Sequence, residues 1–89
     1  MRGIVTVLGK DSVGIIAKIC TYMSERGVNV LDIAQTIVAG YFNMMMVVDL
    51  SGSSEPLASM VVGLETLGRD IGVVVRLQHE DIFNAMHRI

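Results

Sequence analysis

Hydrophobic residues are contiguous or alternate with polar ones in four segments of this chain, which is the pattern of β-strands. In a strand successive side chains point to opposite faces, so alternation marks one buried and one exposed face. The four predicted strands are residues 4–8, 28–38, 41–50 and 73–78. The Ala39-Gly40 step predicts a hairpin turn between the second and third strands, because glycine adopts positive φ without steric cost.

Two further segments place hydrophobic residues three and four positions apart, which predicts helices. The first is expected from about Ser12 to Arg26, with Gly27 as a left-handed stop. Its apolar face is expected to hold Val13, Ile16, Cys20 and Met23, with Ala17 and Ile19 flanking them and Ile15 and Tyr22 widening the apolar sector. The second is expected to begin near Ser54, which can cap it, and to end at Gly72. Its core side is expected to hold Leu57, Met60, Val61, Leu64, Leu67 and Ile71.

The strands also predict which sheet face the helices cover. The side chains expected to face the helices are Leu31, Ile33, Ile37, Met44, Met46, Val48 and Leu50. The opposite face keeps Met45 and Val47 and is therefore only half polar. A short helix over residues 80–89 would present Ile82, Phe83, Met86 and Ile89 on one side. Because so short a helix is marginal alone, we expect it to dock on the half-apolar face of its own sheet or of a partner's.

The order strand, helix, strand, strand, helix, strand predicts an α+β fold of the ferredoxin-like βαββαβ type. Its antiparallel four-stranded sheet would carry two helices on one face. Residues 1–79 are expected to form this domain, and residues 80–89 a C-terminal helix that packs on the same domain or on a dimer partner.

Composition limits the classes of function. Hydrophobic residues make up 52% of the 89 residues and charged ones 18%, which exceeds what one small core can bury and predicts self-association. A net charge of −2 without a basic run argues against nucleic acid. No apolar run is long enough to span a membrane, and no signal peptide is expected. The single cysteine, Cys20, excludes an internal disulfide and indicates a reducing cytoplasm.

The turn between the first strand and the first helix holds the main candidate chemistry. Asp11 or Ser12 can cap the helix. For Asp11, a role as helix cap is therefore favoured over a role as catalytic acid. Gly14 is expected in the first helical turn, where glycine costs roughly 1 kcal/mol relative to alanine. Either a ligand approaches the backbone there or the helix packs tightly on the sheet. Free amides at the helix start would suit a carboxylate or phosphate.

Other candidate sites are weaker. Met44, Met45 and Met46 cannot converge on a soft metal, because the middle residue of a strand triplet points away from its neighbours. His79 and His87 have no histidine or cysteine partner at ligand spacing. We therefore predict neither a metal nor a cofactor.

Two stretches carry a resemblance to a known family. Residues 5–17 read VTVLGKDSVGIIA and residues 27–33 read GVNVLDI, which fit the pattern G-x-D-x-x-G-I, helix, G-x-N-[IV]-x-x-[IL]. Over residues 1–79 the chain resembles the ACT domain, a small regulatory module that binds amino acids. With its tail, residues 78–89, it is similar to small stand-alone ACT-domain proteins of unassigned function, related to those of the glycine-cleavage repressor.

The resemblance implies a side-by-side or face-to-face homodimer with an amino acid at the interface. The ligand would lie between the first loop of one subunit and the start of the second strand of the other. The implied loop half is Asp11, Ser12, Val13, Gly14 and Ile15, and the implied strand half is Asn29, Val30 and Leu31. From the residues alone, Asn29 can equally be a turn residue that bonds its own backbone. Most ACT domains of known role are attached to an enzyme or a DNA-binding segment that they control; this sequence contains neither, so it does not identify a regulated partner.

The resulting hypothesis is a non-enzymatic, cytoplasmic, homodimeric amino-acid sensor. One alternative is a structural or protein-interaction module of the same fold without a ligand. Another is a hydrolase of the acylphosphatase type, which needs an arginine in the first loop. Here that loop offers Lys10 and Asp11 instead.

Overall fold

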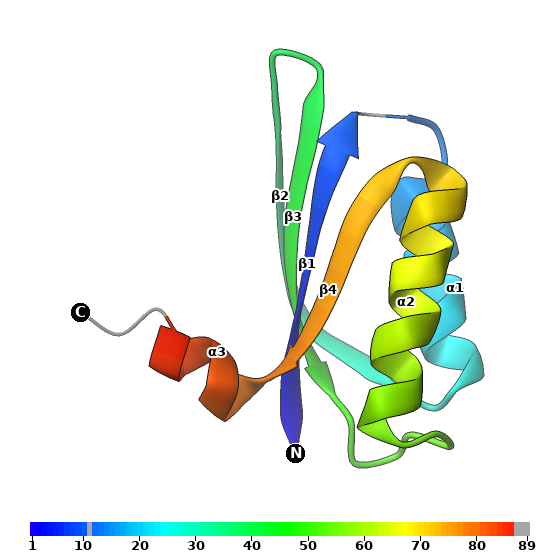
Figure 1. The fold of residues 1–89 in the computed structure, drawn as a ribbon, viewed down its shortest axis with the longest axis vertical. Helices are drawn as coiled ribbons and strands as arrows, with labels where there is room; N and C mark the ends of the chain where they lie inside the picture. Colours follow the sequence, from blue (N-terminus) through cyan, green and yellow to red (C-terminus); the bar gives the residue numbers. More distant parts are fainter. Residues whose placement is uncertain (11, 87–89) are drawn as a thin grey trace.

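The computed structural model describes residues 1–10 and 12–86. Its elements are β1 (Arg2–Lys10), α1 (Ile15–Glu25), β2 (Asn29–Val38), β3 (Tyr41–Asp49), α2 (Leu57–Ile71), β4 (Val73–His79) and α3 (Glu80–Met86). One four-stranded sheet has the order β2-β3-β1-β4, and every neighbouring pair is antiparallel. Helices α1 and α2 cover one face of this sheet (Figure 1). The predicted βαββαβ fold with a short C-terminal helix is confirmed.

The β2–β3 hairpin turns at Ala39 and Gly40, as the sequence predicts. Both residues have positive φ, 51° and 82°. Positive φ at both central positions gives a turn whose twist matches that of the flanking strands. Figure 1 shows that this hairpin extends beyond the ends of the two helices.

The core lies between the sheet and the two helices. Its most buried side chains, all at most 1% exposed, are Val5, Val7, Ile19, Met23, Met44, Met46, Val48, Met60, Leu64 and Val75. The expected inward sides of β3 and α2 are therefore confirmed. Helix α2 approaches β4 closely at Gly68, where an added Cβ would lie 2.7 Å from the Val73 carbonyl oxygen.

Helix α1 differs from the prediction in its start and in its buried side. It begins at Ile15, and it buries Ile15, Ile19 and Met23. Val13 lies in the preceding loop and is fully exposed, so its expected place in the core is wrong. Ile16 and Cys20 reach only the margin of the core. The cause is Gly14, whose left-handed conformation (φ 87°) delays the first helical residue.

Strand β2 is also more exposed than predicted. Leu31, Ile33 and Ile37 keep 49%, 42% and 56% of their surface exposed. Ile33 and Ile37 are opposite the buried Met46 and Phe42, so they do lie on the helix-facing side. However, β2 is an edge strand that the helices do not cover, and a bulge between Val30 and Asp32 shifts its register.

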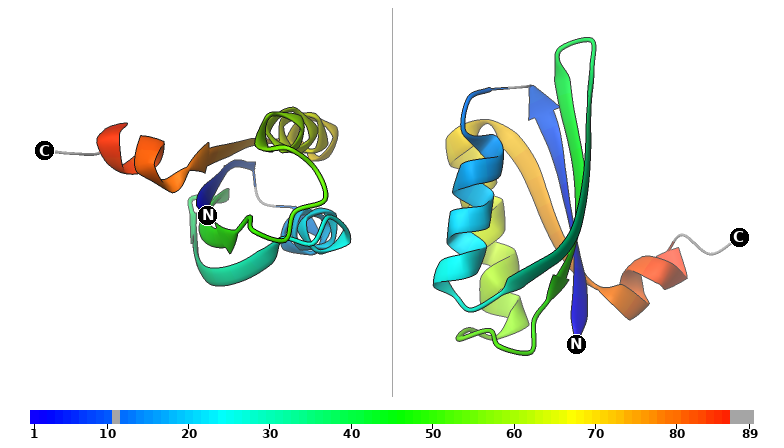
Figure 2. Two further views of the ribbon diagram at one scale, coloured as in Figure 1. Left: turned by 90° about the horizontal axis from the view of Figure 1, so that it is seen from below. Right: turned by 180° about the vertical axis from the view of Figure 1, so that it is seen from behind.

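Helix α3 stands out from the sheet face opposite α1 and α2 (Figure 2). None of its residues is buried, and Ile82 and Met86 are 56% and 63% exposed. It is attached at its beginning, where Arg2 Nε lies 3.3 Å from Glu80 Oε2, and at Met86, whose sulfur accepts a hydrogen bond from Gln78 Nε2 at 3.1 Å. The helix thus contacts only one end of its own sheet, its docking on the same domain or on a dimer partner stays a prediction, and Ile89 lies outside the described residues. None of the helices described is both long and apolar enough to cross a membrane.

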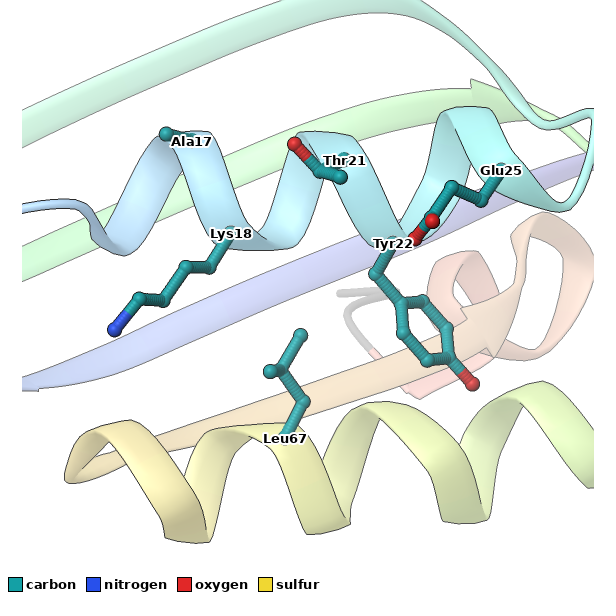
Figure 3. A pocket seen from close by; sticks show the side chains of 6 residues that line it. All are labelled: Ala17, Lys18, Thr21, Tyr22, Glu25 and Leu67. Carbon is teal, nitrogen blue, oxygen red and sulfur yellow. The ribbon is translucent and has the colours of Figure 1, made fainter.

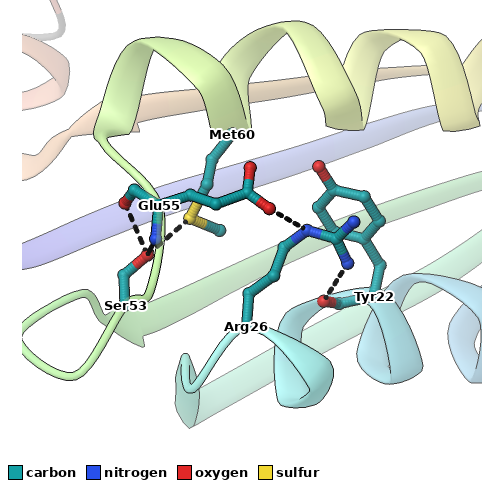
Figure 4. A network of polar contacts seen from close by, with 5 residues as sticks. All are labelled: Tyr22, Arg26, Ser53, Glu55 and Met60. Atoms are coloured by element: carbon teal, nitrogen blue, oxygen red, sulfur yellow. Dashed lines mark hydrogen bonds and ion pairs between the residues drawn. The ribbon is translucent and has the colours of Figure 1, made fainter.

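A polar network joins the end of α1 to the loop before α2 (Figure 4). Arg26 Nε donates to Glu55 Oε2 at 2.7 Å, and Arg26 Nη1 donates to the Tyr22 carbonyl oxygen at 3.1 Å. The Arg26 guanidinium also lies 3.5 Å from the centre of the Tyr22 ring. Helix α2 is preceded by Pro56 and has no side-chain cap, so the cap predicted at Ser54 is wrong.

Candidate functional site

The loop between β1 and α1 shows why glycine occupies position 14. Gly14 is the residue before the helix, with φ 87°, and its carbonyl oxygen accepts a hydrogen bond from Lys18 N at 3.0 Å. Positive φ favours glycine over any residue with a Cβ. An added Cβ would meet only Lys18 Cε at 3.8 Å, so close packing on the sheet is not the reason. Gly14 thus lies before the helix and not inside its first turn.

The N-terminus of α1 has no side-chain cap. Gly14 has no side chain to offer, and the first helical turn contains no acidic residue. The expected cap at Ser12 is therefore wrong, while Asp11 lies outside the described residues. Along the described chain, no side chain accepts a hydrogen bond from the amides of Ile15, Ile16 or Ala17. Unpaired amides and the helix dipole together favour a bound anion at this end.

An open groove of about 460 Å³ lies beside this helix end. Its lining is Ser12, Gly14, Ile15, Ile16, Ala17, Gln35, Ile37 and Phe42. Three of the predicted loop residues, Ser12, Gly14 and Ile15, therefore line one groove. The sequence analysis missed its second wall, which β2 and β3 supply. The available signal was Gln35, a polar residue between Ile33 and Ile37 on the expected inward side of the strand.

The strand half of the predicted site lies elsewhere. Asn29 pairs with Asp49 of β3, and Asp49 pairs on its other side with Arg2 at the start of β1. The loop follows Lys10, at the opposite end of β1. Nearly the whole length of β2, roughly 30 Å, separates the two halves. The Asn29 side chain is exposed and makes no hydrogen bond within residues 1–10 and 12–86. It is therefore not a turn residue that bonds its own backbone. A single chain does not bring the two halves together.

A second groove, of about 310 Å³, lies between α1 and α2 and was not predicted (Figure 3). Tyr22 and Leu67 form its apolar part, and Lys18 and Glu25 lie along its α1 side. The Tyr22 ring reaches over Gly63 on α2, where any Cβ would overlap the Tyr22 hydroxyl. This groove can receive a small apolar side chain between two opposite charges.

The Asp49 carboxyl, which lies far from both grooves, has a shifted pKa. A hydrogen bond from the Ser51 side chain, then one from the Ser51 amide, lowers the pKa of the Asp49 carboxyl below its usual 3.8. The Ser51 N to Asp49 Oδ1 distance is 2.9 Å. Asp49 closes the turn after β3 and is a local structural group.

Comparison with known proteins agrees with this architecture. Residues 3–78 match a family model described as the ACT domain. A UPF0237 protein of Bifidobacterium longum is 58% identical over 88 residues, which is 99% of this chain and 98% of that protein. An ACT domain protein from Streptococcus pneumoniae superposes with a TM-score of 0.82 at 36% identity, over 93% of both chains.

A protein assigned as a glycine cleavage system transcriptional repressor shares the fold at a TM-score of 0.73 and 19% identity. The match covers 89% of this chain and 47% of that one. The family model and the two preceding likenesses confirm the resemblance drawn from the sequence, and this one shows a shared fold. The stretch matched by the family model contains both halves of the candidate site.

Proposed function

Because this chain belongs to the ACT domain family, we propose that it is a non-enzymatic regulatory module, a homodimer that binds a free amino acid at its subunit interface. ACT domain homologues are regulatory modules that bind amino acids or other small molecules. The observation that carries the proposal is the open groove beside the uncapped start of α1. Backbone amides exposed there suit an α-carboxylate.

A second copy would complete this site. Strand β2 lies at the sheet edge, is ten residues long, and contains one charged residue, Asp32, and no proline. Such an edge is open to pairing with another strand. Antiparallel pairing of two β2 strands across a two-fold axis would set the start of one beside the end of the other. The partner's Asn29 would then approach the groove at Gly14.

The groove also offers contacts for the rest of an amino acid. Asn29 from the second copy has a carboxamide oxygen that can accept hydrogen bonds from the ligand's ammonium group. Ile37 and Phe42 form an apolar wall for a side chain, and Gln35 provides an amide on the same wall. This division between a polar end and an apolar wall favours an α-amino acid over a bare inorganic anion.

A thermal-shift panel with each of the twenty amino acids tests the proposal. A ligand present at 100 times its Kd adds about 2.7 kcal/mol to the free energy of unfolding. For a domain of this size that corresponds to a rise in Tm of roughly 10 °C or more. Asn29→Ala should lose the shift, whereas Asn84→Ala, an exposed asparagine on α3, should keep it. No shift with any amino acid would refute the proposal.

An interaction module without a ligand is the second candidate, and the groove between α1 and α2 is the observation that favours it. It predicts an unchanged Tm throughout the panel. The hydrolase of the acylphosphatase type has no support of this kind, because residues 9–15 contain no arginine. An acyl phosphate assay should therefore show no turnover.

A further inference from the structure

The groove beside the start of α1, called here the loop groove, has walls without charge. Among the described residues, its lining contains no lysine, arginine, histidine, aspartate or glutamate. Ile15 and Phe42 are 2% and 3% exposed, so they form its base. Ile16 packs at the margin of the core, and Ile37, at 56% exposure, forms the outer wall on β2. A ligand side chain in this groove would therefore exchange water for hydrocarbon on several sides.

The charged side chains of α1 and β2 point away from the loop groove. On α1 these are Lys18 and Glu25, which line the groove between α1 and α2 instead (Figure 3). On β2 the one charged residue is Asp32, which lies opposite Val47 on the other face of the sheet. The Asp32 carboxylate already accepts a hydrogen bond from the Ile33 amide at 2.8 Å. Neither element thus offers an ion-pair partner to a charged ligand side chain in the loop groove.

Gln35 lies at the end of the loop groove that is farther from the loop itself. It stands on β2 between Ile33 and Ile37 and opposite the buried Met44, so it is on the helix-facing side of the strand. About 7 Å of strand separates it from Ile37. Its side chain is exposed and forms no hydrogen bond with any residue that the structure describes. A ligand held by its carboxylate at the start of α1 would extend its side chain past Ile37 toward Gln35.

We propose that the loop groove selects an α-amino acid with an uncharged, apolar side chain, and that Gln35 is the residue that limits this selectivity. The inference rests on the proposed amino-acid function and narrows its ligand class. A charged side chain would lose part of its water in the groove without gaining an ion-pair partner, which is unfavourable. An apolar side chain gains about fourfold in Kd for each methylene that it buries. The strand half expected from a second copy is also uncharged, so it leaves the class unchanged; it is Asn29, Val30 and Leu31.

Isothermal titration calorimetry of the wild type with five amino acids tests the ligand class. The probes are alanine, leucine, glutamate, lysine and norleucine, which has the carbon chain of lysine without its terminal ammonium group. Leucine should bind roughly tenfold or more tightly than alanine, because it buries three more carbon atoms. Norleucine should bind roughly tenfold or more tightly than lysine, because only lysine brings an unpaired charge into the groove.

Variants at position 35 test the role of Gln35. Gln35→Lys places a cation at the far end of the groove, so it should shift the preference from leucine toward glutamate by roughly tenfold. Gln35→Leu extends the apolar wall and should tighten leucine binding by about fourfold. Thr36→Lys is the matched control, because it adds the same charge to the next residue of β2 on the opposite face of the sheet. It should leave the ratio of the leucine and glutamate affinities unchanged.

The outcomes distinguish this inference from the proposed function on which it rests. Binding of glutamate or lysine in preference to leucine would overturn the apolar class and still support an amino-acid site. A wild type that prefers leucine, with a Gln35→Lys variant of unchanged preference and native circular dichroism, would remove Gln35 from the specificity of the site. No heat of binding with any of the five probes, and no thermal shift with any of the twenty amino acids, would refute the proposed function and this inference together.

Discussion

Replacing Gly68 by alanine sets helix propensity against packing, and the structure decides the sign. Gly68 lies in the interior of α2, where alanine is intrinsically preferred by about 1 kcal/mol. An added Cβ would lie 2.7 Å from the Val73 carbonyl oxygen, 2.9 Å from Val75 Cγ2 and 3.2 Å from Val75 N. Two of these three atoms belong to the backbone of β4 and cannot rotate away.

The cost follows from the movement that this overlap requires. Helix α2 must shift away from β4 by several tenths of an ångström, which loosens the contacts of buried Leu64 and Met60. Overpacking of this kind costs about 1–3 kcal/mol. After subtracting the gain in helix propensity, we expect Gly68→Ala to lower the free energy of unfolding by about 1 kcal/mol. In a small domain this lowers Tm by roughly 4–8 °C.

Urea unfolding followed by circular dichroism measures this difference, at one fixed protein concentration because the proposed self-association would contribute to stability. Ser59→Ala, at an exposed position of the same helix, is the control and should be neutral or slightly stabilising. If Gly68→Ala proved as stable as the wild type or more stable, the close approach of α2 to β4 would be wrong.

Two further predictions concern polar contacts. Arg26→Ala removes the ion pair with Glu55 and the contact with the Tyr22 ring. Because both contacts are partly exposed, it should lower the free energy of unfolding in urea by about 1 kcal/mol. Arg26→Lys should recover only part of this stability, and an unchanged urea midpoint for Arg26→Ala would contradict the network. Asp49 has a lowered pKa in the folded state, so its stabilising effect is complete above the usual 3.8 and is lost as the pH falls through the folded value. Asp49→Asn should therefore flatten the acid limb of the stability curve, and an unaltered limb would contradict the Ser51 hydrogen bonds.

Features set by local sequence were predictable. The hairpin at Ala39-Gly40 and the end of α2 at Gly72 follow from glycine at positions that adopt positive φ. The buried side of β3 follows from alternation. The buried side of α1 did not follow, because it depends on where the helix begins. Periodicity allowed either Val13 or Ile15 to start the apolar stripe, and the left-handed Gly14 selects Ile15.

Features set by the order of strands were not predictable in the same way. Ile33 and Ile37 have the pattern of core residues, yet they are exposed because β2 is an edge strand beyond the helices. The same position puts Gln35 and Phe42 beside the α1 terminus, so the second wall of the groove was missed. The loop half of the candidate site is one continuous segment, so the resemblance could indicate it, and its role in binding stays a prediction.

The apolar surplus of the sequence can now be assigned to particular surfaces. It lies on the β2 edge at Ile33 and Ile37, and on the sheet face opposite α1 and α2 at Leu8 and Met45. Antiparallel pairing of two copies along their β2 edges lies in the plane of the sheet. It would shelter Ile33 and Ile37 but leave the opposite face of each sheet uncovered.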